Sequence, residues 1–389
     1  MPITFPLAPQ EELAPAAKAD LSRVRAPQHG RYLEDLAPGL VFAHPRGLTI
    51  DPGLARSFAT TFHQANPLYL NEPCAKAHGF ARLPASPQLV FNVVLSLGVQ
   101  NDSEKAMANL GYYHAQFLYP VLAGDTLRAF TKVVDRKDRG AGKPGIVSLR
   151  TSGVNQNGKV VLQYERKIMV FPRGDRPTAS APPAGAAEFP WIDDPRVALP
   201  LVAHPKVPAL TGANTYFEDF APGDILVHAN GRTITDEHVA WTYGVGNTHP
   251  LHYDRVYSGG LAGAMSGEPI VYGGLVFAWL EGLASRDVTE NALWELGFTE
   301  GYHTQPVVAG DTVAAITRVL VAEPGPAGLD AGVLTLQLIG VKNVSAAQAL
   351  DRHGAELFVK ENDKKDLGRE KIAAKVFEIE RRVLVKRRP

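Results

Sequence analysis

The pattern of apolar and polar residues along this chain predicts a long buried helix surrounded by strands. Between Leu275 and Leu283 the apolar side chains recur at helical spacing and cover most of the circumference of the helix. A helix that is apolar on nearly every side must be buried. We therefore predict that the rest of its unit encloses this helix.

Most of the remaining segments have the pattern of strands. They are rich in β-branched residues or alternate polar and apolar side chains, as Thr312-Val-Ala-Ala-Ile-Thr-Arg-Val-Leu320 does. Because strands and helices do not alternate, the predicted class is α+β with a mainly antiparallel sheet wrapped around the helix. The predicted strands span residues 126–134, 145–153, 160–170, 312–320, 332–340 and 376–385.

The chain contains two copies of one unit. Tyr32-Leu-Glu-Asp-Leu-Ala-Pro-Gly39 returns 184 residues later as Tyr216-Phe-Glu-Asp-Phe-Ala-Pro-Gly223. Pro120-Val-Leu-Ala-Gly-Asp-Thr126 returns 186 residues later as Pro306-Val-Val-Ala-Gly-Asp-Thr312. Such a long period with so little drift indicates a tandem domain and not a solenoid. Two such units are expected to share one continuous sheet.

The second copy contains an insertion. Tyr164-Glu-Arg-Lys-Ile-Met-Val170 returns as Ile379-Glu-Arg-Arg-Val-Leu-Val385, 215 residues later, which places about 29 extra residues near 344–375. Its charged stretch Val359–Asp366 is expected to be a solvated loop. The chain then divides into an arm, a first unit, a Pro- and Ala-rich linker and a second unit, at residues 1–28, 29–175, 176–208 and 209–389.

Composition excludes several classes of protein. The 40 Lys and Arg residues balance the 40 Asp and Glu residues, which gives no bulk electrostatic reason to expect nucleic acid or an anionic membrane. Cys74 is the single cysteine, so an intrachain disulfide framework and a Cys-rich zinc site are excluded. The N-terminus lacks the pattern of a secretory signal, and the apolar runs are too short to span a bilayer. We expect a cytoplasmic protein.

The residues best suited to chemistry lie in Gly246-Asn-Thr-His-Pro-Leu-His-Tyr-Asp254 and at the start of the buried helix. The first amides of a helix have no internal acceptor, so those of Gly273 and Gly274 are suited to hold a developing oxyanion. The nearby imidazole of His252 can carry a proton at neutral pH. The sequence therefore predicts an acid–base site at this point.

This segment resembles the hallmark of the MaoC-like hydratase family, relatives of R-specific enoyl-CoA hydratases, which reads Asp-x-Asn-Pro-x-His-x-Asp. The resemblance covers about residues 29–389 and implies a double hot-dog fold, in which each sheet wraps one long helix. Asn247 replaces the family's leading Asp. The matching positions in this chain are Asn247, His249, Pro250, His252 and Asp254.

A narrower likeness is to the mesaconyl-CoA (2-methylfumaryl-CoA) hydratases, also called β-methylmalyl-CoA dehydratases. It implies a hydro-lyase that adds or removes water across the α,β double bond of an acyl-CoA thioester, with coenzyme A only as part of the substrate. No resident cofactor and no metal are expected. The motifs that carry it are Asn247-Thr-His-Pro-Leu-His252, Ala108-Asn-Leu-Gly-Tyr112, Gly124-Asp-Thr-Leu127, Gly145-Ile-Val, Gly153-Val-Asn-Gln-Asn-Gly158 and Met169-Val.

The two copies differ at the positions of the predicted chemistry. Tyr69 stands where the second copy has His252, and Pro87-Gln88 replaces Gly273-Gly274. Proline has no N–H to donate, so the first copy lacks both the imidazole and the donors. We predict one active site per chain, in the second copy, with the first copy supplying a wall of the acyl-CoA tunnel.

The predicted catalytic group is His252 as base and proton carrier, the amides of Gly273 and Gly274 as carbonyl donors, and Asn247 as the residue that orients water. The predicted substrate contacts are Thr248, His249, Asp254, Arg255 and Tyr272. Three of these have a structural alternative: a loop hydrogen bond for His249, a turn or ion pair for Asp254, and a solvated surface position for Arg255.

Other functions stay open at this point. They are an R-specific enoyl-CoA hydratase for aliphatic acyl chains, a hot-dog acyl-CoA thioesterase, and a non-catalytic acyl-CoA-binding protein. Hot-dog units usually pair their sheets, and the two copies can satisfy this pairing within one chain. A homodimer is therefore an optional further assembly.

Overall fold

The computed structural model describes residues 3–4, 19–26, 28–174, 188–202, 210–212, 214–261 and 267–389. Most of the predicted arm and part of the predicted linker lie outside the described residues. Residues 188–202 of the linker form neither helix nor strand and run along the first unit. They are held there by hydrogen bonds such as the one from the Ala198 N–H to the Leu118 carbonyl, at 2.9 Å.

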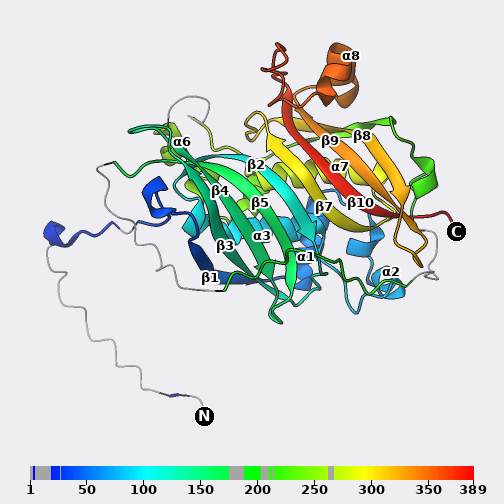
Figure 1. Ribbon diagram of the computed structural model, residues 1–389, viewed down its shortest axis with the longest axis horizontal. Coiled ribbons are helices and arrows are strands. Elements are labelled where there is room, and N and C mark those ends of the chain that lie inside the picture. Colours follow the sequence, from blue (N-terminus) through cyan, green and yellow to red (C-terminus); the bar gives the residue numbers. More distant parts are fainter. Residues whose placement is uncertain are drawn as a thin grey trace.

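Ten strands form one antiparallel sheet in the order β1-β3-β4-β5-β2-β7-β10-β9-β8-β6 (Figure 1). The first unit contributes β1 (Val41–Thr49), β2 (Ala106–Phe117), β3 (Thr126–Lys137), β4 (Gly145–Val154) and β5 (Val160–Val170). The second contributes β6 (Ile225–Thr233), β7 (Ala292–His303), β8 (Thr312–Pro324), β9 (Ala331–Lys342) and β10 (Lys375–Lys386). Strands β2 and β7 pair at the centre and join the two units into one sheet.

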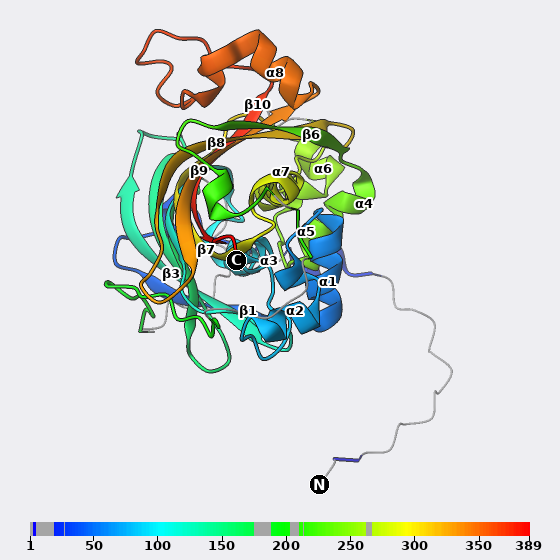
Figure 2. The same cartoon turned by 90° about the vertical axis from the view of Figure 1, so that its right-hand side faces the viewer.

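Two 16-residue helices, α3 (Pro87–Asp102) and α7 (Gly273–Val288), lie inside the curl of the sheet (Figure 2). Every residue of α3 except Gln100 is buried. The helices touch at their N-terminal ends, where the Asn92 side-chain amide donates to the Gly274 carbonyl at 3.0 Å. The predicted long buried helix and α+β class are thus confirmed, with one helix in each unit.

Short helices close the open side of the curl. They are α1 (Pro52–Thr61), α2 (Glu72–Ala77), α4 (Asp236–Val239), α5 (Trp241–Gly244) and α6 (Arg255–Gly259). Single turns of 3₁₀ helix occur at Leu21–Arg23, Leu33–Asp35, Pro67–Tyr69, Phe217–Asp219 and Pro250–His252. No described helix has both the length and the apolar content needed to cross a membrane.

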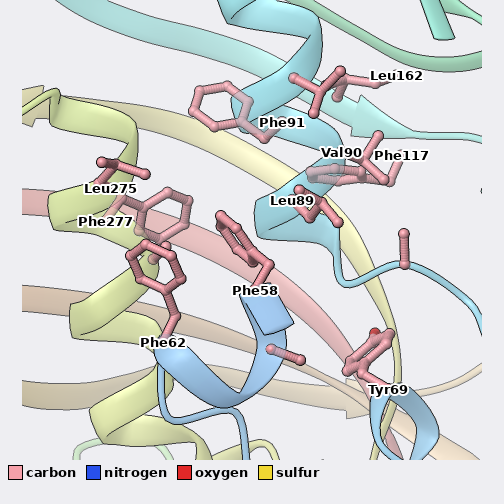
Figure 3. Close-up of a cluster of buried hydrophobic side chains, with 14 of the residues drawn as sticks. Phe58, Phe62, Tyr69, Leu89, Val90, Phe91, Phe117, Leu162, Leu275 and Phe277 are labelled. Atoms are coloured by element: carbon pink, nitrogen blue, oxygen red, sulfur yellow. The ribbon is translucent and has the colours of Figure 1, made fainter. Parts of the chain in front are cut away.

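Helix α1 of the first unit packs on α7 of the second, so the core is shared between the copies (Figure 3). The rings of Phe62 and Trp279 are 4.8 Å apart. The backbones of the two segments approach so closely that a Cβ on Gly282 would stand 1.6 Å from the Phe62 carbonyl oxygen. Only glycine fits this contact.

The structure bears out the six strands predicted from sequence to within four residues at each end, but the edge strands β1 and β6 and the central strands β2 and β7 were not among them. The sequence Ala-Met-Ala-Asn-Leu-Gly-Tyr-Tyr-His-Ala-Gln-Phe of β2 has no clear alternation. It also contains Gly111, at a φ of 152°. The central strands β2 and β7 place polar side chains in an internal cavity. Such side chains interrupt the alternation of polar and apolar residues by which a strand is recognised.

The predicted insertion lies between β9 and β10 and contains α8 (Ala346–His353) and a 3₁₀ segment, Gly354–Phe358. The stretch Val359–Asp366 is a loop, as expected, but it is only partly solvated: Asn362, Asp363, Lys365 and Asp366 are exposed, whereas two of its charged residues are buried. Within it Glu361 is 1% exposed and Lys364 is fully buried, and their charged groups are 2.7 Å apart. The charges are buried because they neutralise each other under the insertion.

Candidate active site

A cavity of about 250 Å³ lies at the N-terminal end of α7, between the two units. The second unit lines it with the loop that ends at His252, with Tyr272 and Gly273, and with the end of β7. The first unit lines it with the C-terminal half of α3 and with β2 and β5. One cavity is therefore built from both copies, with the first copy forming a wall.

His252 ends the 3₁₀ turn that begins at Pro250, which fixes where its ring points. Its Nδ1 is 2.8 Å from the carbonyl oxygen of Ile270, so Nδ1 carries the proton and donates. No described residue hydrogen-bonds to Nε2. Burial lowers the pKa of this imidazole from 6.5 to about 4. At neutral pH His252 is therefore an uncharged base whose lone pair is available in the cavity.

Asn247 lines the same cavity and is 2% exposed. Its side-chain oxygen accepts the His249 N–H at 2.9 Å, and its own N–H donates to the Thr242 carbonyl at 3.0 Å. These bonds hold the loop in shape. A carboxamide cannot accept a proton at neutral pH, so Asn247 can orient a water but cannot act as the base.

His249 lines the cavity and also clamps the loop to the first unit. Its Nδ1 accepts the Leu251 N–H at 3.2 Å, so the proton is on Nε2, which donates to the Ala106 carbonyl at 3.2 Å. Burial lowers its pKa to about 3, with neighbouring His252 adding to the effect. Both ring nitrogens therefore have hydrogen-bond partners within the protein. These bonds match the structural alternative for His249, in which the side chain holds the loop in place.

The first two amides of α7 have no acceptor among the described residues; Leu275 is the first, donating to the Tyr272 carbonyl at 2.9 Å. Gly273 lines the cavity. Gly274 lies against the first unit, where a Cβ would stand 2.2 Å from the Asn92 side-chain oxygen. Packing requires glycine at both positions, since a Cβ on Gly273 would also be too close to His303, and of the two N–H groups that of Gly273 is at the cavity.

Tyr272, in the N-cap position of α7, also lines the cavity. Its hydroxyl is 3.4 Å from the Ser96 hydroxyl on α3. Burial raises the pKa of the phenol well above its ordinary value, so Tyr272 stays protonated. Of the predicted substrate contacts, Tyr272 and His249 reach the cavity.

Three predicted substrate contacts do not reach it, because other groups hold them. Thr248 donates to Glu104 at 3.2 Å. Asp254 caps α6 by accepting the N–H groups of the next turn at 2.8 and 3.0 Å. Arg255 pairs with Glu268 at 2.8 Å, and both side chains are more than half exposed. The turn and surface alternatives hold for Asp254 and Arg255.

The chain is similar to known proteins over most of its length. The family model for mesaconyl-CoA hydratase matches residues 14–347. The chain belongs to the mesaconyl-CoA hydratase family. It is 31% identical over 341 residues to a mesaconyl-CoA hydratase of Cereibacter sphaeroides, covering 85% of this chain and 92% of the relative. It is also 31% identical over 319 residues to a β-methylmalyl-CoA dehydratase of Chloroflexus aurantiacus, covering 81% and 89%.

Solved structures agree on the fold. A MaoC domain protein dehydratase of Chloroflexus aurantiacus superposes with a TM-score of 0.77 and 27% identity, covering 96% of this chain and all of that one. A Mycobacterium tuberculosis protein with a double hotdog fold superposes with a TM-score of 0.69 and 23% identity, covering 91% and 98%. The predicted double hot-dog fold is confirmed.

In this member of the mesaconyl-CoA hydratase family, sequence reasoning missed a row of polar side chains on the sheet. His303, on β7, is 3.3 Å from the Tyr112 hydroxyl, and burial lowers its pKa to about 4. A Cβ on Gly273 would stand 2.4 Å from its Nε2. Tyr112 is in turn opposite Arg166 on β5. No spacing along the chain joins these residues, because their contacts depend on strand register.

The first unit holds a matching pocket that is closed. Only about 10 Å³ remains between Tyr69, Gln88 and the side chains of Glu281, Glu295 and Arg381. Burial raises the pKa of Glu295 to about 7 even though Arg381 is beside it. In this family member, therefore, the pocket at the start of α7 is open, whereas its counterpart at the start of α3 is filled by side chains that include Glu281, Glu295 and Arg381 of the second unit.

Proposed function

We propose that this chain is a hydro-lyase that interconverts mesaconyl-CoA and β-methylmalyl-CoA, with one active site per chain at the cavity of the second unit. The observation that carries the proposal is the uncharged His252 with its free Nε2, which lines the same cavity as Gly273 with its unpaired N–H. Conjugate addition of water needs a base that is unprotonated at neutral pH and a hydrogen-bond donor for the thioester oxygen. Membership of the mesaconyl-CoA hydratase family supplies the substrate.

In the proposed hydration, His252 Nε2 removes a proton from water as the oxygen bonds to the β-carbon. The π electrons move toward the α-carbon and the thioester oxygen, and the N–H of Gly273 stabilises the resulting enolate. The imidazolium then gives its proton to the α-carbon, which restores the thioester. No proton is gained or lost overall, and no resident cofactor or metal takes part. Asn247 orients the water.

Three alternatives remain distinguishable by experiment: hydration of aliphatic enoyl-CoA, thioester hydrolysis, and binding without turnover. No observation favours any of them over the first proposal. We also propose that the protein is cytoplasmic and that a homodimer is an optional further assembly.

The test follows the absorbance of the conjugated enoyl thioester with purified protein. We expect rapid loss with mesaconyl-CoA, little with crotonyl-CoA, and no release of free thiol with either. Preference for crotonyl-CoA would replace the diacid by an aliphatic substrate, and free thiol would indicate a thioesterase. Binding of mesaconyl-CoA with no absorbance change would contradict the enzyme.

A further inference from the structure

The open and closed pockets are built from equivalent positions in the two units. Arg166 is opposite Tyr112 in the β5–β2 pair, and Arg381 is opposite Phe298 in the β10–β7 pair. In the same two pairs Asn109 is opposite Ile168 and Glu295 is opposite Val383. Arg166 thus corresponds to Arg381, and Asn109 corresponds to Glu295. Since α3 and α7 also begin at matching residues, Leu95 corresponds to Glu281.

In the closed pocket the arginine binds carboxylates that belong to the protein. The Nε of Arg381 donates to Glu295 at 2.9 Å, and a terminal guanidinium nitrogen contacts Glu295 as well. The same terminal nitrogen is 3.2 Å from Glu281. One buried guanidinium is therefore matched by two carboxylates, through its Nε and one terminal nitrogen.

In the open pocket the equivalent arginine has one carboxylate. Arg166 is 4% exposed and lines the cavity, and a terminal nitrogen of its guanidinium pairs with the fully buried Asp102. Its Nε is buried and has no hydrogen-bond partner among the described residues. The positions that supply carboxylates in the closed pocket are Leu95 and Asn109 here.

Asn109 has a similar imbalance. It lines the cavity, and its side-chain nitrogen and oxygen are both buried without a partner among the described residues. Polar groups that are buried without a partner destabilise the empty pocket. A ligand that supplies acceptors to the Nε of Arg166 and to the side-chain nitrogen of Asn109 would satisfy both of these donors.

We infer, building on the proposed hydratase function, that Arg166 and Asn109 bind the free carboxylate of a dicarboxylic acyl-CoA. This carboxylate takes the place that the Glu295 carboxylate occupies in the closed pocket. Mesaconyl-CoA carries such a group on its β-carbon, the atom that water attacks. Held at one end by Arg166 and at the thioester by the Gly273 amide, the diacid would be fixed in orientation across the cavity.

This assignment replaces Arg255, which the sequence suggested as a substrate contact, and it is also preferred over Arg232 on β6. Arg255 is paired with Glu268 at the surface, and a terminal nitrogen of Arg232 contacts His238. Arg166 differs from both because it is buried, lines the cavity and belongs to the first unit. The copy without catalytic groups would thus determine which acyl group is accepted.

The test measures binding by calorimetry with two saturated thioesters that cannot be hydrated. 2-Methylsuccinyl-CoA keeps the distal carboxylate, and 2-methylbutyryl-CoA has a methyl group in its place. We expect wild-type protein to bind the diacid about 10- to 100-fold more tightly, as a charge-assisted bond to a buried arginine implies. The double variant Asp102→Val, Arg166→Met should bind both with equal affinity.

The double variant removes both members of the buried pair, so no unpaired charge is left behind. Valine fits because the position equivalent to Asp102 in α7 is Val288. A matched control is Arg150→Met on neighbouring β4, whose partner Glu165 is part-exposed and outside the cavity. The control should keep the preference for the diacid.

A second variant, Asn109→Glu, copies the closed pocket into the open one. It gives Arg166 a carboxylate within the protein, so the variant should fold, lose the preference and bind the diacid less tightly than the monoacid. Equal affinity of wild-type protein for the two thioesters, or a preference that survives in both variants, would overturn the carboxylate site. Because neither thioester is hydrated, failure of turnover would contradict the proposed hydratase alone.

Discussion

The two hot-dog units place a pocket at the same point and use it differently. The pocket of the second unit is a cavity of about 250 Å³, whereas its counterpart has about 10 Å³ left. His252, with a free nitrogen, corresponds to buried Tyr69, and Gly273 corresponds to Pro87, which has no N–H. The closed pocket lacks the base, the amide donor and the space together, which supports the proposal of one active site per chain.

The bonds that the two pockets share identify which residues are structural. In the second unit the Asn247 oxygen accepts the His249 N–H, and in the first the Gln64 oxygen accepts the Asn66 N–H. His249 donates across to the Ala106 carbonyl, and Asn66 donates to the equivalent Ala292 carbonyl at 2.7 Å. Since the closed pocket keeps these bonds, they shape the loop and do not by themselves provide catalysis.

We expect the largest effect when the second unit loses its base, because this removes its main chemical difference from the first unit. His252→Ala should lower kcat for mesaconyl-CoA roughly 10³-fold, as loss of general acid–base catalysis does, while 2-methylsuccinyl-CoA still binds within a few-fold. Its mirror variant, Tyr69→Phe, should leave kcat unchanged. Steady-state kinetics and calorimetry on the three proteins make the comparison. Normal turnover by His252→Ala would refute the assignment of the site.

The next effect concerns the closed pocket and stability. Arg381→Met would leave Glu281 and Glu295 buried without their cation, so the free energy of unfolding should fall by about 3 kcal/mol. Denaturant unfolding followed by circular dichroism measures it. The affinity for 2-methylsuccinyl-CoA should change little, in contrast to the effect expected at Arg166. A variant as stable as wild type would show that the ion pairs of the closed pocket contribute little.

Much of the fold could be predicted because the two copies repeat the same short turn sequences. Two copies of Ala-Pro-Gly and Ala-Gly-Asp-Thr fix the unit, and the all-round apolar surface of α7 fixes its place inside the sheet. The comparison of His252 with Tyr69 also indicated, from sequence alone, the copy that proves to hold the open cavity. These are local patterns, which residue spacing records directly.

The wall of the cavity could not be predicted in this way. Asn109, Tyr112, Arg166 and His303 line one cavity only because of the register of β5, β2 and β7, and no local spacing encodes that register. The charges of Glu361 and Lys364 suggested solvent, although the two side chains pair inside the protein. Partners far apart in sequence decide both cases.

The number of acyl-CoA molecules bound per chain tests the contrast between the pockets most directly. Calorimetric titration of wild-type protein with 2-methylsuccinyl-CoA gives this number without turnover. The open cavity of the second unit and the filled pocket of the first predict one molecule per chain. Two molecules per chain would show that the first unit also accepts substrate, and would contradict the account.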